Sequence, residues 1–258
     1  MKNLKPAINL LLEIKKNLSF LDRVKFNNIK NFRSKKKLSI DPVTHIDLKV
    51  EKLIRAKISK KFPSHSIMGE EFKEKKRKSN FKWVIDPIDG TKNMIMGLPT
   101  WSNLIGLFEK NTSVISFANF PVLNKFYFAF QKKSFVLEKN RKKIILSNKR
   151  ADYKTARVAV NTFRTIKDRK IFNLFKNYKG IFKITGSDAY NFCLVAEGKI
   201  DVLIEKGLKQ VDILPLISII KNSGAIITDW NGKQKYNKGE VLVAANKKLH
   251  KYFLKKVS

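Results

Sequence analysis

The sequence predicts a layered α/β (α+β) fold for this chain of 258 residues. Three observations support that class. Apolar residues recur at helical spacing near the N-terminus, segments typical of antiparallel strands follow, and helical and strand patterns alternate through the second half. Hydrophobic residues make up 43% of the chain, which is enough to bury a substantial core.

Two helices are predicted first, because apolar residues recur there every three or four positions. One covers residues 3–26 and the other covers residues 45–62. The residues that form these apolar stripes are Leu4, Ile8, Leu11 and Leu12 in the first, and Val50, Leu53, Ile54 and Ile58 in the second.

Strands are predicted next. The segment "FPSHSIMGEEF" reads as a loop and a short strand, and residues 82–86 form an apolar strand that ends at Asp86. The segments "WSNLIGLFE", "SVISFANF" and "KFYFAFQ" show the alternation of antiparallel strands.

The second half alternates between strand and helix patterns, which favours stacked layers. The predicted strands are "ARVAV", "IFKIT", "KIDVLIE", "AIITD" and "VLVAA", and the predicted helices cover 164–177, 189–198, 212–223 and 246–255. The composition turns polar near 135–150, so we expect two sub-domains, residues 1–140 and 141–258. The first would carry most of the site and the second its last acidic residue.

The formal net charge of +34 raises the question of a nucleic-acid partner. Only nine of the 55 basic residues are Arg, and the lysines spread along the whole chain without a nucleic-acid-binding motif. We therefore interpret the charge as compositional bias that favours solubility, with a field that attracts small phosphorylated substrates. A nucleic-acid partner is not expected.

The expected location is the cytoplasm. No apolar run approaches the length of a membrane span, so no membrane partner is expected. The single Cys193 excludes an internal disulfide and fits a reducing compartment, and its apolar surroundings predict a core position.

The segment "WVIDPIDGTKN" (83–93) poses the chemical question. Asp86 and Asp89 end an apolar run, and buried carboxylates repel each other unless a cation or proton separates them. Mg²⁺ prefers oxygen ligands, and the carbonyl of Ile88 offers a third oxygen. Gly90 allows close backbone approach, and Thr91 offers a hydroxyl and an N–H to an anion. The alternative is a plain turn, because Asp-Pro and Asp-Gly are common turn dipeptides.

Other acids also end apolar segments. Glu70 and Glu71 follow "SIMG", while Asp47 and Asp212 stand at the starts of predicted helices. Each has a structural alternative, since Asp is a common helix N-cap or first-turn residue. Four such positions together favour a shared metal site.

These segments resemble a known family. "DPVTHID" (41–47), "GEE" (69–71), "WVIDPIDGTKN" and "VDILPLISIIKNSGAIITDWNG" (211–232) look like the ordered motifs of the inositol monophosphatase family. That family consists of Mg²⁺-dependent phosphomonoesterases. The resemblance implies a layered α-β-α-β-α sandwich, a homodimer and a small phosphorylated metabolite as substrate.

The resemblance also implies roles for individual residues. Glu70 and Thr91 would orient the attacking water, with Asp47 paired to Thr91, while Glu71 would lie further from the metal. The turn at Gly90 and Thr91 would bind phosphate. The implied metal ligands are Glu70, Asp86, the carbonyl of Ile88, Asp89 and Asp212.

Two or three Mg²⁺ ions per site are implied by this resemblance. One Mg²⁺ would lower the pKa of a bound water, and a second would offset charge on the leaving-group oxygen.

The substrate is predicted from the C-terminal half, which is most similar to the histidinol-phosphate phosphatase branch. Asp188 and Glu205 would bind the charged groups of L-histidinol phosphate, whose hydrolysis yields L-histidinol and phosphate late in histidine biosynthesis. Asp188 has an N-cap alternative, and Glu205 could be a surface partner of a lysine. The hairpin around 131–146 departs from the family pattern, which leaves its geometry open.

Other functions stay open at this point. The nearest alternative is a phosphatase for inositol 1-phosphate or another sugar or nucleotide phosphate. A more remote one is a nucleic-acid-binding protein on the same fold.

Overall fold

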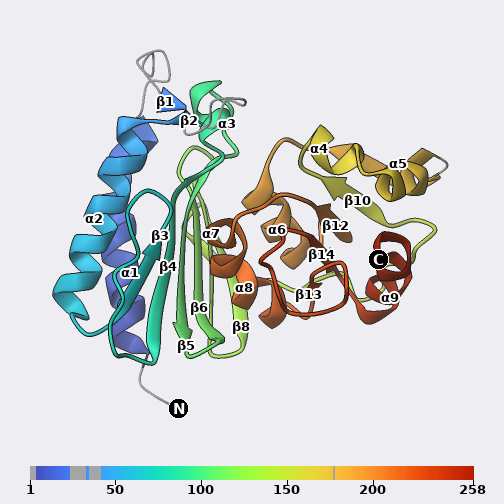
Figure 1. Ribbon diagram of the computed structural model, residues 1–258. Helices are drawn as coiled ribbons and strands as arrows, with labels where there is room; N and C mark the ends of the chain where they lie inside the picture. Colours follow the sequence, from blue (N-terminus) through green and yellow to red (C-terminus); the bar gives the residue numbers. More distant parts are fainter. Residues whose placement is uncertain (1–3, 24–32, 35–41, 177) are drawn as a thin grey trace.

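The computed structural model describes residues 4–23, 33–34, 42–176 and 178–258. Five layers lie side by side in it (Figure 1): the N-terminal helix pair, a seven-stranded sheet, a middle helical layer, a five-stranded sheet and a final helical layer. The expected α-β-α-β-α sandwich is therefore confirmed.

The first layer consists of α1 (Lys5–Asn17) and α2 (His45–Lys61). Helix α1 is shorter than the predicted 3–26, because a 3₁₀ turn (Ser19–Arg23) replaces its last turns, and 24–26 lie outside the described residues. Leu12 was wrongly placed in the apolar stripe, since it is 49% exposed.

The seven-stranded sheet has the order β3-β4-β5-β6-β7-β8-β9. Only its first pair is parallel, and the other neighbours are antiparallel, as expected for the central segments. The strands are β3 (Ser66–Gly69), β4 (Phe81–Asp89), β5 (Ser102–Glu109), β6 (Thr112–Phe120), β7 (Lys125–Phe130), β8 (Lys133–Glu138) and β9 (Arg141–Ile144).

Strand β4 runs further than predicted. Its pairing with β5 resumes at Asp89 after a register shift that follows Asp86. Pro87 has no N–H to donate to a ladder, so it is accommodated where the regular pairing is interrupted. The strand therefore carries both aspartates instead of ending at the first.

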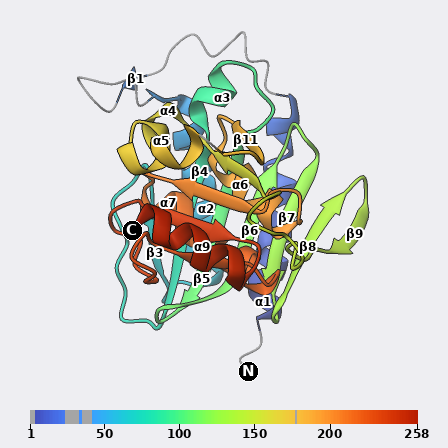
Figure 2. The same cartoon turned by 90° about the vertical axis from the view of Figure 1, so that its right-hand side faces the viewer.

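The polar segment near 135–150 contains two strands of the large sheet. Lys139 and Asn140 have positive φ and form the turn between β8 and β9, which projects at the edge of the molecule in Figure 2. The predicted division after residue 140 falls in this turn, yet β9 beyond it still pairs with β8. The two-part organisation itself stays a prediction.

The five-stranded sheet has the order β11-β10-β12-β14-β13 and is mixed. A separate two-stranded pair near the top of Figure 1 joins β1 (Arg33–Ser34) to β2 (Pro42–Val43). The five strands are β10 (Arg157–Val160), β11 (Ile181–Ile184), β12 (Val202–Glu205), β13 (Ile226–Thr228) and β14 (Val241–Ala244).

Two predicted helices are broken. The segment 164–177 forms two helices, because the Asp168 side chain accepts the Lys170 N–H at 3.1 Å and starts a new helix. The segment 212–223 is interrupted by Pro215, which cannot donate an intrahelical hydrogen bond. The observed helices are α4 (Phe163–Ile166), α5 (Arg169–Lys176), α7 (Gln210–Ile213), a 3₁₀ turn (Leu214–Leu216) and α8 (Ile217–Asn222).

The helices predicted at 189–198 and 246–255 are found within two residues of those bounds, as α6 (Asp188–Ala196) in the middle layer and α9 (Lys247–Val257), which covers the outer face in Figure 2. The short helix α3 (Thr91–Ile95), which follows β4, was not predicted. Three hydrophobic cores fill the spaces between layers, and Cys193 is buried in the central one. Among the helices of the described part, none has the length and apolar character that crossing a bilayer demands.

Candidate active site

A cleft of about 360 Å³ opens where the end of β4 meets the starts of α6 and α7. We call it the acidic cleft. Eight of the residues predicted to form the site line it, whereas Asp47 and Glu205 do not. The eight are Glu70, Asp86, Ile88, Asp89, Gly90, Thr91, Asp188 and Asp212.

The end of β4 is fixed by the neighbouring strand. The side-chain amide of Asn103 donates to the carbonyl of Pro87 at 2.7 Å, which holds the interrupted part of the strand against β5. Gly90 then takes a φ of 79°, a left-handed conformation that favours glycine, and α3 begins at Thr91. This geometry turns Asp86 and Asp89 toward the same cleft.

Asp86 is a buried acid of the cleft whose carboxyl lacks a full set of hydrogen-bond partners among the described residues. It is only 2% exposed, and its Oδ1 has no hydrogen-bond partner among the described residues. Burial, followed by repulsion from Glu70 and then Asp89, raises the pKa of this carboxyl well above its usual value. A buried carboxylate in this position requires either a proton or a cation.

Asp89 has a structural role as well as a place in the cleft. Its Oδ2 accepts the backbone N–H of Ala189 at 3.3 Å and faces the Ser102 hydroxyl at the same distance. It therefore caps the start of α6. Burial, then repulsion from Asp188, raises the pKa of Asp89 well above the ordinary range.

Asp47 lies behind the cleft and supports Thr91. Its Oδ2 accepts the backbone N–H of Thr44 at 2.8 Å, completing a capping box at the start of α2. Its Oδ1 lies 3.1 Å from the Thr91 hydroxyl, which is also 3.0 Å from the carbonyl of Ile88. The structural and functional alternatives for Asp47 are thus compatible, because different oxygens serve them.

Glu51 was missed by the sequence analysis, although it positions the Glu70 loop. It is fully buried, accepts the backbone N–H of Glu71 at 2.7 Å and pairs with Arg55 at 2.6 Å. A Cβ at Gly69 would lie 2.0 Å from the Glu51 carboxylate, so only glycine permits this approach. A signal was available, because Glu51 follows Asp47 by four residues on the same helix face.

Lys209 is a second residue that the sequence analysis missed. Its ammonium lies 2.7 Å from the carboxylate of Glu70, and its backbone N–H donates to Asp212 at 2.7 Å. Asp212 is therefore the third residue of α7, after Lys209 at the N-cap, rather than the N-cap itself. Burial, then repulsion from Asp188, raises the pKa of Asp212 to about 7.

The donor set of the cleft suits a hard divalent cation. It combines carboxylate oxygens with the Ile88 carbonyl, and the unpartnered Oδ1 of Asp86 points to an ion that would satisfy it. In the segments that the structure describes, no three acidic, His or Cys side chains already converge as a finished cage. Binding an ion therefore requires these side chains, including the Lys209-paired Glu70, to turn toward one point.

The other end of the cleft is formed by Asp188 and Asn161. The Asn161 amide donates to Asp188, and burial raises the pKa of Asp188 to about 6. Glu205 lies behind them: it is 1% exposed, and its Oε2 lies 3.2 Å from the Thr165 hydroxyl. Glu205 is thus neither a surface residue nor part of the cleft lining, and Asn161 is the contact residue that sequence analysis overlooked.

The match to known proteins covers almost the whole chain. Residues 4–258 match the inositol monophosphatase family. The chain belongs to this family. Its fold neighbours agree, since the Thermotoga maritima IMPase superposes with a TM-score of 0.82 and 26% identity over 96% of each chain.

Individual relatives of this inositol monophosphatase family member carry different names. A histidinol-phosphatase from Chlorobaculum parvum is 30% identical over 216 residues, covering 80% of this chain and 79% of the relative. A fructose-1,6-bisphosphatase/inositol-1-monophosphatase from Aquifex aeolicus is 30% identical over 233 residues, covering 89% and 86%. Others are named Nus factor SuhB.

A longer relative is the bifunctional phosphatase IMPL2, chloroplastic, from Arabidopsis thaliana. It is 30% identical over 209 residues, which cover 80% of this chain but only 59% of that protein. The shared family identifies this inositol monophosphatase family member as a phosphatase that acts on phosphoric monoesters.

Proposed function

We propose that the chain is a Mg²⁺-dependent histidinol-phosphate phosphatase, which converts L-histidinol phosphate and water to L-histidinol and phosphate. We further propose that it works in the cytoplasm as a homodimer, within histidine biosynthesis. The observation that carries the proposal is the two-part character of the acidic cleft: one end suits a divalent cation, and the other suits a positively charged substrate group.

The metal end would be held by Glu70, Asp86, Asp89, Asp212 and the Ile88 carbonyl. Bound Mg²⁺ supplies a Lewis acid that activates water and offsets the charge of the phosphate. Asp86 is the central candidate, because its unpartnered buried oxygen gains most from a cation.

The residues around Thr91 would position the reactants. Asp47 accepts from the Thr91 hydroxyl, which leaves the hydroxyl oxygen able to accept a hydrogen bond from the attacking water. Glu70 would orient the same water from the opposite loop, which Glu51 holds in place. The left-handed turn at Gly90 brings the backbone close to the phosphate.

The substrate end favours a cationic ester. Asn161 Oδ1 and Glu205 Oε1 are buried, and neither has a hydrogen-bond partner among the described residues. Asn161 and Asp188 line the cleft together, and Glu205 lies behind them. The ammonium and imidazole of histidinol phosphate supply N–H donors and positive charge, whereas inositol supplies only hydroxyls. Glu205 would act through Asp188 and Asn161 rather than touch the substrate.

Inositol 1-phosphate or another sugar phosphate is the second candidate. It is favoured by the fructose-1,6-bisphosphatase/inositol-1-monophosphatase relative, which is as similar as the histidinol-phosphatase and covers more of this chain. Hydroxyl groups could also satisfy the unpartnered oxygens near Asp188.

The test is a substrate panel with Mg²⁺ in which released phosphate is measured. We expect histidinol phosphate to give the highest kcat/KM. Asp188→Asn should lower that value by about 30-fold or more, because a buried charge pair is lost. It should lower kcat/KM for inositol 1-phosphate by only roughly 2- to 10-fold, the effect of altering a neutral hydrogen bond.

The matched control is Asp152→Asn, since Asp152 pairs with Lys248 at 2.7 Å and lies outside the cleft. It should leave both values unchanged. Much faster hydrolysis of inositol 1-phosphate by the unaltered protein would reject the histidinol assignment and leave a sugar-phosphate phosphatase.

A further inference from the structure

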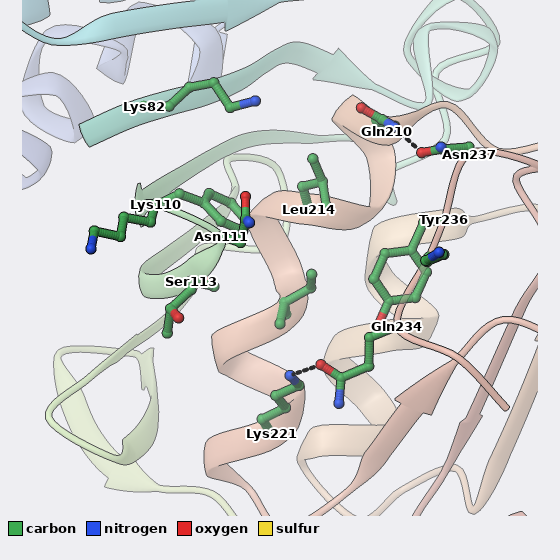
Figure 3. Close-up of a pocket in the computed structure, with 14 residues that line it drawn as sticks. Lys82, Lys110, Asn111, Ser113, Gln210, Leu214, Lys221, Gln234, Tyr236 and Asn237 are labelled. Atoms are coloured by element: carbon green, nitrogen blue, oxygen red, sulfur yellow. Dashed lines mark hydrogen bonds between the residues drawn. The ribbon is translucent and has the colours of Figure 1, made fainter. Parts of the chain in front are cut away.

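A second hollow of about 360 Å³ lies on the other side of α7 (Figure 3). We call it the basic pocket. It is formed where the β5–β6 hairpin meets α7, α8 and the loop 234–237. Neither the family relationship nor the proposed reaction assigns it a role.

The charge of the basic pocket is uniform. Its lining includes four lysines and no Asp or Glu, and in the described part of the chain no carboxylate forms a salt bridge with these lysines. By contrast, Lys206 and Lys209 nearby each reach an acid at 2.8 Å or less. The four lysines are Lys82, Lys110, Lys221 and Lys235.

Lys221 shows the consequence most clearly. Its ammonium donates to the side-chain carbonyl of Gln234 at 2.7 Å, a neutral partner that leaves the charge uncompensated. Partial burial lowers the pKa of Lys221. In Figure 3, Lys82 and Lys221 lie on opposite sides of Leu214, while the ammonium of Lys110 points outward.

The pocket also has an apolar surface and an amide rim. Leu214 projects into the space between the lysines, and the Tyr236 ring forms the facing wall in Figure 3. The Gln210 amide donates to the Asn237 side-chain carbonyl at 2.5 Å, which ties α7 to the loop 234–237. An inorganic ion would satisfy the lysines but would leave this apolar surface in water.

We propose that the basic pocket binds a small organic anion with an apolar body, whose negative group pairs with Lys221 and whose body packs against Leu214, while Lys82 adds positive charge from the other side of Leu214. This inference goes beyond the proposed phosphatase function and does not depend on it, because it concerns a different surface and needs no metal.

The test uses 2-naphthalenesulfonate as the probe, since a sulfonate is not hydrolysed by a phosphatase. Binding is measured by titration calorimetry without Mg²⁺, at about 0.15 M ionic strength to screen diffuse attraction. Lys221→Gln should weaken probe binding about threefold to fivefold, as for an exposed charge pair. Lys221→Gln combined with Lys82→Gln should weaken it further, by about fivefold to tenfold in total, because both charges attract the anion.

Three controls make the outcome decisive. Lys251→Gln removes an exposed charge on α9 and should leave probe binding unchanged. Lys92→Gln alters the acidic cleft and should also leave it unchanged. Inorganic sulfate should bind far more weakly than the probe.

If Lys251→Gln weakened probe binding as much as Lys221→Gln does, the loss would reflect net charge alone. If only Lys92→Gln weakened it, the probe would bind in the acidic cleft. Either result overturns the proposal, as does sulfate that binds as tightly as the probe. The lysines are replaced at the surface, and an unchanged circular dichroism spectrum checks that each variant is folded.

Discussion

The acidic cleft and the basic pocket lie on two sides of one helical turn and have opposite charge. Five acidic side chains line the cleft, in a chain whose net charge is +34. The pocket collects four lysines and no acid. Overall charge therefore says little about a local site, because each hollow is set by the few side chains that folding brings together.

The two hollows also differ in how they tolerate their charge. Asp86 and Asp89 are withdrawn from water, so their pKa values rise, and their ionised forms need a cation. Three of the pocket lysines (Lys110, Lys221 and Lys235) are exposed to solvent, so their charge carries a smaller desolvation penalty than that of the buried acids. We therefore expect a metal ion in the cleft to raise the free energy of unfolding strongly, and an anion in the pocket to raise it weakly.

The largest expected effect comes from removing one carboxylate of the acidic cleft. Asp89→Asn should lower phosphatase activity by about 10³-fold or more, because a charged metal ligand and transition-state stabiliser is lost. The fold should persist, because the amide keeps an oxygen that can accept the Ala189 N–H. Phosphate release and circular dichroism check both parts. Activity near that of the unaltered protein would refute the metal role and would favour the nucleic-acid alternative.

A second prediction concerns pH and stability. Acids with raised pKa values bind protons more readily when folded, so without divalent ions the free energy of unfolding should fall as pH rises from about 4. This fall should continue through about 7, the pKa of Asp212. Mg²⁺ at 100 times its Kd should then add about 2.7 kcal/mol, or roughly 5–10 °C in Tm.

That Mg²⁺ stabilisation should be larger at pH 8 than at pH 5, where protons compete for the same carboxylates. Thermal unfolding with Mg²⁺, compared with NaCl of equal ionic strength, measures it. An equal rise with NaCl would mean that general screening, and not the acidic cleft, is responsible.

Glu51→Gln tests a residue that does not line the cleft but supports one of its loops. Glu51 holds the loop that carries Glu70, and removing its charge weakens the bonds to Arg55 and to the Glu71 N–H. We expect Mg²⁺ affinity to fall by about 10- to 100-fold, as for other residues that orient metal ligands. Calorimetric Mg²⁺ titration is the measurement. Glu13→Gln, which alters an exposed pair with Lys57, is the control that should leave affinity unchanged.

The smallest expected effect comes from Lys209→Gln. The Lys209 ammonium lies 2.7 Å from Glu70, so it competes with a cation for that carboxylate. Its removal should raise Mg²⁺ affinity by about twofold to fivefold, in line with one charge pair of partial exposure. Lys206→Gln, which alters the pair with Asp168, is the control and should leave Mg²⁺ affinity unchanged. Weaker Mg²⁺ binding in Lys209→Gln would show that the ammonium supports the site instead of competing with it.

Much of the acidic cleft could be predicted from the sequence, because its acids end apolar segments at recognisable motifs. Eight predicted residues line one cleft, although their roles as ligands stay predictions. Glu51 was missed although its spacing from Asp47 offered a signal, because its contact with the Glu71 N–H joins segments twenty residues apart. Asn161 was missed because its contact with Asp188 forms only on folding. Lys209 was hidden among 46 lysines that are spread along the whole chain.

The layers of the fold were predicted well, but the points where helices and strands are interrupted were predicted less well. Apolar periodicity located the sheets and most helices, because burial follows it directly. The break at Pro215 and the continuation of β4 through Pro87 depend on local hydrogen bonding that periodicity does not report. The basic pocket was not predictable either, since its lysines belong to no motif and come together only when residues 82 and 108–113 pack against 210–221 and 234–237.

Helix α7 gives the two hollows a common wall. Gln210 belongs to the basic pocket and Asp212 to the acidic cleft, and residues two apart point to different sides of a helix. Ligands bound in the two hollows would therefore contact the same short helix. By thermodynamic linkage, if one ligand changes the binding affinity of the other by some factor, the second changes the affinity of the first by the same factor. A substitution in this turn is consequently felt by both neighbours at once.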